Sequence, residues 1–173
     1  MSSTGQTIAL IKALSGGGGG GGGGSEEQFS EVYETTLQNA AEMLMISSTD
    51  MGGAYIDMVV CASNSQALAS DTAYQIALSA DEGGNTIVWG DEGTFPAHGD
   101  WAIVLSAIST GGLLDVGKTV ETINGQTGER MFLPYLLRYP TSERPCISMI
   151  GMAMQNGIPA GTVITVYARK KVA

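Results

Sequence analysis

The chain has 173 residues and a formal net charge of −9, with 43% hydrophobic but only 14% charged residues. This acidic balance excludes a nucleic-acid partner, because phosphate binding needs clustered Lys and Arg and the one basic run, 169–171, is too short to form such a surface. No stretch approaches the roughly 18 apolar residues of a membrane-spanning helix, so we expect no membrane insertion. A charged fraction below the usual roughly 25% suits a subunit that buries surface against its neighbours.

Residues 1–15 form a short leader that is apolar from Ile8 onward. It lacks the charged start and the long apolar core of a secretory signal, so we expect a protein made in a cytoplasm and not secreted. An exposed apolar peptide promotes aggregation. The leader is therefore predicted to be a docking peptide, which adds a strand to a neighbour's sheet edge or lies in a groove. The residues expected to make this contact are Ile8, Leu10, Ile11 and Leu14.

Nine consecutive glycines, residues 16–24, follow the leader. In water a Gly-rich segment of this length is a flexible coil with an end-to-end distance of roughly 16 Å. Because glycine has no Cβ atom, such a segment can thread a crowded gap between subunits. We therefore predict a tether that neighbouring chains contact along its length, from Gly16 through Gly20 to Gly24.

A helix is predicted over residues 25–46. Ser25 and Gln28 fit the N-cap and third helical position of a capping box, and apolar residues then recur at helical spacing. The apolar face either packs on the chain's own domain or forms a short bundle around an oligomer axis, for which we favour a trimer. Its residues are Phe29, Val32, Tyr33, Leu37, Ala40 and Leu44.

Residues 52–173 have the pattern of an all-β domain, in which short apolar segments, several with period-two alternation, are separated by turn sequences. Asn124-Gly125 is a strong hairpin signal, and residues 158–161 favour a tight turn. Pro134 places its strand at an edge or a bulge. Together these features predict a β-sandwich or jelly-roll-like domain. The predicted strands are 54–63, 73–80, 86–89, 101–108, 118–123, 130–137, 147–154 and 162–169.

The segment 112–119 (GLLDVGKT) matches the phosphate-binding pattern G-x-x-x-x-G-K-T. A working loop of this kind opens a helix whose N-terminus faces the phosphates. Here the loop interior is bulky, and the residues that follow are β-branched and run into a hairpin turn. The sequence therefore predicts a strand connection with Lys118 directed to solvent rather than a nucleotide site.

Other candidates for chemistry are few. The single histidine, His98, lies in a loop without a nucleophile motif nearby, and no spacing typical of a metal site occurs. The acidic pairs 81–82 and 91–92 either bind Ca²⁺ loosely or are solvated loop charges. Cys61 and Cys146 form one disulfide or remain free thiols in apolar strands. We predict no enzymatic activity, no cofactor and no metal.

The leader segment 4–14 (TGQTIALIKAL) resembles the opening T-G-K-T-I-A-L-I-K-A-L of many small virion proteins encoded by phages and prophages of gut Firmicutes, with Gln6 in place of the usual Lys. The closing segment 158–167 looks like the last hairpin of phage fibre-head domains. The resemblance implies a structural virion protein, assembled in the host cytoplasm, whose leader fastens a fibre, tail-tip or capsid-surface appendage to other virion proteins. Linked copies would bind a host-surface glycan or protein with avidity. The alternatives are a capsid decoration protein and a free β-sandwich that binds a glycan or small ligand.

Overall fold

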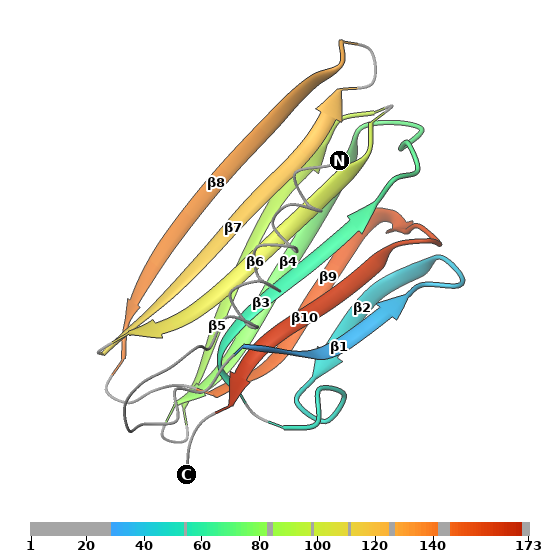
Figure 1. Cartoon of the computed structure of the whole chain (residues 1–173). Helices are drawn as coiled ribbons and strands as arrows, with labels where there is room; N and C mark the ends of the chain where they lie inside the picture. Colours follow the sequence, from blue (N-terminus) through green and yellow to red (C-terminus); the bar gives the residue numbers. More distant parts are fainter. Residues whose placement is uncertain are drawn as a thin grey trace, which may run out of the picture.

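The computed structural model describes residues 29–53, 55–82, 85–97, 99–110, 112–124, 127–141 and 146–170. Within these ranges the chain forms ten strands, paired antiparallel throughout, and no helix. The strands lie in two layers packed face to face (Figure 1). The predicted β-sandwich is therefore confirmed.

The first sheet has six strands in the order β1-β10-β3-β6-β7-β8, and it is the layer nearest the viewer in Figure 1. The strands on the right in Figure 1, β1, β10 and β3, are distant from one another in sequence, whereas β6, β7 and β8 follow one another as a meander. Its strands are β1 (Ser30–Thr36), β10 (Val163–Lys170), β3 (Tyr55–Asn64), β6 (Trp101–Thr110), β7 (Leu113–Asn124) and β8 (Glu129–Pro140).

The second sheet has four strands in the order β2-β9-β4-β5. A single backbone pairing, between Tyr55 of β3 and Ile147 of β9, links it to the first sheet. It is two strands narrower than the first sheet, and this difference leaves part of the first sheet without a facing layer. Its strands are β2 (Ala41–Ser47), β9 (Cys146–Ile158), β4 (Thr72–Glu82) and β5 (Asn85–Phe95).

The core lies between the two sheets and is tightly filled. Alternate residues of each strand point into it, as the period-two geometry of a strand requires. Met58 and Val60 of β3 and Ile150 of β9 are each less than 5% exposed. The space left at the centre of the core has a volume of about 10 Å³, which is barely room for one water molecule.

The turn between β9 and β10 crosses from one sheet to the other. β9 pairs with β2 and β4, whereas β10 pairs with β1 and β3. Asn64 holds the turn by donating hydrogen bonds to the Ala160 carbonyl (3.1 Å) and the Thr162 hydroxyl (2.9 Å). Gly161 has a φ of 79°, a conformation that favours glycine. The tight turn is as predicted, but the hairpin suggested by the resemblance is not what forms here.

The helix predicted over residues 25–46 is wrong for residues 29–46, which form β1, a short connection and β2. Residues 25–28 lie outside the described residues. Both strands gain a hydrogen-bonded neighbour, β10 for β1 and β9 for β2, and this tertiary pairing overrides the local helical pattern. A bulge between Glu31 and Tyr33 shifts the alternation within β1, which hides its strand character in the sequence.

The eight strands predicted in the C-terminal domain are all present, although most extend beyond their predicted ends. The largest extension is in β5, which continues through the polar residues 90–95. Pro134 lies in β8, which pairs only with β7 among the described strands. The prediction that this proline marks an edge strand is therefore confirmed. Among the residues described, no helix is long and apolar enough to cross a membrane.

Candidate functional site

The leader and tether residues predicted to anchor the chain lie outside the described residues, so their contacts remain predictions. This applies to Ile8, Leu10, Ile11, Leu14, Gly16, Gly20 and Gly24. His98 lies outside the described residues as well.

The residues predicted as an oligomer-forming helix face are placed on strands and turns instead. Val32 and Tyr33 of β1, Leu37 in the connection that follows β1 and Leu44 of β2 pack partly buried against the core of the sandwich. Ala40 is exposed in the connection between the two strands. Because the described part of this segment contains no helix, the alternative of a helical bundle around an oligomer axis loses its basis.

Lys118 connects the two sheets inside the molecule. Its side chain projects from β7 and is only 7% exposed, its ammonium donates a hydrogen bond to the Tyr74 hydroxyl (2.9 Å) and it pairs with the carboxylate of Asp91. Tyr74 belongs to β4 and Asp91 to β5. Burial lowers the pKa of Lys118, but the hydrogen bonds to Asp91 and Tyr74 outweigh it, so that the net shift is upward. Lys118 therefore stays charged at neutral pH.

This arrangement corrects the expectation that Lys118 points to solvent. Gly112 forms the turn between β6 and β7 with a φ of 87°, and the residues after it continue as β7. The helix N-terminus that a phosphate-binding loop needs is replaced by a strand. The Lys118 ammonium already contacts two protein partners, Tyr74 and Asp91. The motif therefore has no free lysine to bind a phosphate group.

A second ion pair lies on the other side of the first sheet. Asp57 of β3 is fully buried and accepts a hydrogen bond of 2.7 Å from Nε of Arg169, its cross-strand partner on β10. The guanidinium also lies 5.5 Å from the ring centroid of Phe29, within the range of a cation–π contact. These charges are satisfied by each other, as buried charges generally must be.

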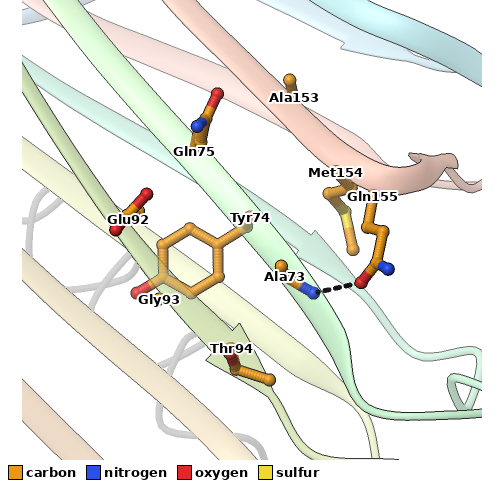
Figure 2. A pocket seen from close by; sticks show the side chains of 9 residues that line it. All are labelled: Ala73, Tyr74, Gln75, Glu92, Gly93, Thr94, Ala153, Met154 and Gln155. Atoms are coloured by element: carbon orange, nitrogen blue, oxygen red, sulfur yellow. Dashed lines mark hydrogen bonds between the residues drawn. The ribbon is translucent and has the colours of Figure 1, made fainter.

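The outer surface of the second sheet carries a hollow of about 430 Å³, shown in Figure 2. Gln75, Glu92, Thr94 and Gln155 give it hydrogen-bonding side chains, and the Gln155 amide oxygen approaches the Ala73 amide at 3.5 Å. Tyr74, the aromatic residue in the lining of the hollow, is only 3% exposed, so the Tyr74 ring is not free to stack on a sugar. The remaining lining residues are Ala73, Tyr74, Gly93, Ala153 and Met154.

The ring of Tyr74 occupies space that a side chain on the neighbouring strand would need. A Cβ atom at Gly93 would lie 2.4 Å from the Tyr74 hydroxyl oxygen. Phe95 and Trp101 continue the aromatic cluster, with ring centroids 4.5 Å from Tyr74 to Phe95 and 4.9 Å from Phe95 to Trp101. The tyrosine therefore serves the core and the Lys118 contact rather than the hollow.

β8 presents apolar side chains to solvent. Its inward-facing residues Met131, Leu133 and Tyr135 are 40–52% exposed, and Leu136 on the opposite face is 59% exposed. The cause is the narrower second sheet: Asp91 of β5 reaches Lys118 of β7, and beyond β7 no described strand faces β8 (Figure 1). We call Met131, Leu133, Tyr135 and Leu136 the β8 apolar strip.

Cys61 is buried and Cys146 is half-buried, and both are free thiols, which resolves the question of a disulfide between them. Burial raises the pKa of the Cys61 thiol to about 11, so this thiol is not an activated nucleophile. Within the described ranges no three His, Cys, Asp or Glu residues gather in a way that could hold a metal ion.

Comparison of the chain with protein-family models, curated proteins and solved structures gives no match.

Proposed function

We propose that this chain is a structural protein of a phage particle, a fibre, tail-tip or capsid-surface appendage that works by assembly rather than by catalysis. The observation that carries the proposal is the β8 apolar strip, together with a leader that resembles those of phage virion proteins. An exposed apolar patch on a small protein usually marks a contact with another protein. We take that protein to be a neighbouring subunit, another copy of this chain.

The shape of the strip favours face-to-face packing over strand addition. β8 is a twelve-residue edge strand, and an unpaired edge of this length invites another strand. Pro134 lies near its middle and has no amide hydrogen, so that a continuous ladder cannot form along this edge. A neighbour would instead cover Met131, Leu133 and Tyr135, which extend the inner face of the sheet.

The polar groups support an assembling role. The described buried charges, Lys118 with Asp91 and Asp57 with Arg169, are each used in joining strands of the same fold. Among the described residues, the interior then holds no uncommitted acid or base and no activated nucleophile of the kind that catalysis needs.

Labelling of particles tests the proposal. An antibody raised against the chain should bind regularly to phage particles purified from the source culture, with gold label at one defined site in electron micrographs. Mass spectrometry of the same particles should detect the chain in a fixed ratio to the major capsid protein. Absence of the chain from purified particles would contradict the proposal.

A second candidate function rests on the hollow of Figure 2. Its amide and carboxylate groups could bind the hydroxyl groups of a glycan, as in a free carbohydrate-binding β-sandwich. Titration with soluble glycans separates the two: a glycan affinity that is lost in Gln75→Ala and Glu92→Ala would favour this candidate, whereas the appendage proposal does not require it.

A further inference from the structure

We propose that the outer face of the first sheet is the seat of the chain's own leader, residues 8–14. This inference concerns the free chain and does not depend on membership of a virion.

The outer face is formed by the residues of β3, β6 and β10 that alternate with the core residues. In the central part, on β3 and β6, their side chains are small and uncharged, and the register places them next to one another across the two strands. The central members are Val59, Cys61, Ser63, Ala102, Val104 and Ser106. We call these six residues the small-residue face.

Side chains on and beside this face are buried although they point away from the core. Cys61 and Tyr167 are each 2% exposed, and Ala102 is 5% exposed. These three are the buried apolar residues that do not belong to the main core cluster. An uncovered sheet leaves its outer side chains in contact with water. Something therefore covers this face.

The cover does not come from the ten strands. The second sheet packs against the opposite, inner side, and Figure 1 shows no described strand over the side nearest the viewer. The gaps between described ranges contain at most four residues each, and three residues follow Lys170. Residues 1–28 are the one stretch outside the described ranges that is long enough to cover a three-strand face.

The described chain begins at the border of this face. Phe29 contacts the guanidinium of Arg169, and Arg169 with Asp57 marks one end of the outer side. Residues 15–28 separate this point from the leader, and fourteen extended residues span at most about 50 Å. A ten-residue strand is only about 33 Å long, so the tether lets the leader reach any part of the face.

The chemistry of the two partners matches. The leader contributes Ile8, Leu10 and Ile11 with one charge, Lys12. The small-residue face offers an uncharged surface on which four of the six side chains are apolar and two are serines. Small side chains let a second backbone approach a sheet closely. A tethered peptide also has a high effective concentration, so that a weak contact is occupied without a partner molecule.

Thiol labelling of the full chain tests the inference. In a Cys146→Ser background, Cys61 is the one remaining thiol and reports access to the small-residue face. We expect dithiobis(nitrobenzoate) to react with Cys61 at least about tenfold faster when Leu10→Asp and Ile11→Asp are introduced, because protection reflects the fraction of time the site is covered. Ser2→Asp with Ser3→Asp adds the same charge before the apolar run and should leave the rate unchanged.

Three outcomes would overturn the inference. Equal labelling rates in the leader variant and the control would show that the leader does not cover Cys61. Protection that disappears when the parent protein is diluted would show that a second copy provides the cover. If the leader variant unfolds, hydrogen exchange of the parent decides: amides of residues 8–14 that exchange as fast as in an unstructured peptide would contradict the proposed seat.

Discussion

The two faces of the first sheet differ in the size of the buried side chains that they carry. The inner face carries large residues such as Leu105 and Ile103, which interdigitate with the second sheet. The outer face carries small ones such as Cys61 and Ala102, which are nearly as well buried. Sheet-on-sheet packing leaves about 10 Å between backbones and needs large side chains to fill the gap. A face of small residues suits a thinner cover that lies close to the sheet.

The comparison also separates two kinds of apolar surface. The β8 apolar strip is open to solvent, whereas in the small-residue face Cys61 and Ala102 are buried and the other four residues are half-buried. We therefore assign the strip to a neighbouring subunit and the small-residue face to the chain's own leader.

The inner face should carry most of the stability. Leu105→Ala removes a side chain that is 1% exposed in the core, and we expect it to lower the free energy of unfolding by about 2–5 kcal/mol, as large-to-small substitutions in cores do. Urea unfolding measures this difference. Ser106→Ala, one residue along and on the outer face, is the matched control and should change the free energy by less than about 1 kcal/mol.

A charge introduced on the outer face should lower the free energy of unfolding, and the size of this loss should depend on whether the leader is intact. Val104→Asp places a carboxylate at the centre of the small-residue face, and we expect a loss of about 1–3 kcal/mol if that face is covered by apolar residues. The same substitution should cost much less in a chain that already carries Leu10→Asp and Ile11→Asp. A double-mutant cycle measures the coupling, and purely additive effects would remove the distinction between the two faces that we draw.

The Lys118 contact should contribute less than the apolar core. We expect Lys118→Met to lower the free energy of unfolding by about 1–2 kcal/mol, because Asp91 loses its partner but, at 24% exposed, remains partly hydrated. Thermal unfolding with and without ATP and Mg²⁺ gives a second readout. The parent should show no nucleotide-dependent shift, and a shift that Lys118→Met abolishes would revive a phosphate-binding role.

Alkaline pH should lower the free energy of unfolding through the ionisation of Tyr167, a residue on the outer face. Burial, and secondarily the charge of Glu31, raises the pKa of Tyr167 to about 12 from a usual value near 10. A raised folded-state pKa contributes stability below the unfolded pKa and loses it as pH rises through the folded one. The parent should therefore lose stability between about pH 10 and 12 more steeply than Tyr167→Phe. Parallel pH profiles of the two proteins would argue against a buried hydroxyl at this position.

The sequence predicted the β-sandwich well where alternation was regular. β10, with Ile164, Val166 and Ala168 on one face, is the clearest example. It failed for β1 and β2, where a bulge between Glu31 and Tyr33 breaks the alternation and a helical spacing of apolar residues takes its place. The strand predicted at 86–89 was also shorter than β5, because most of residues 90–95 are polar or glycine and form a strand through their pairing with β4.

The burial of Lys118 is implied by the alternation of the sequence around it. Leu114, Val116, Lys118 and Val120 share one face of β7 by simple alternation, and that face is the buried one. The match of residues 112–119 to a phosphate-binding loop spans the same residues as this alternation, and in the folded chain the alternation decides where Lys118 points. The partners Tyr74 and Asp91 lie on two other strands, and only the folded arrangement brings them together.

Photo-cross-linking tests the leader's seat most directly. With benzoylphenylalanine in place of Leu10 in the full chain, irradiation at low protein concentration should give a product of monomer mass. Its cross-links should map to β3 and β6 within residues 59–63 and 102–106. Cross-links confined to other regions such as β8, or products that form only as covalent dimers, would contradict the account.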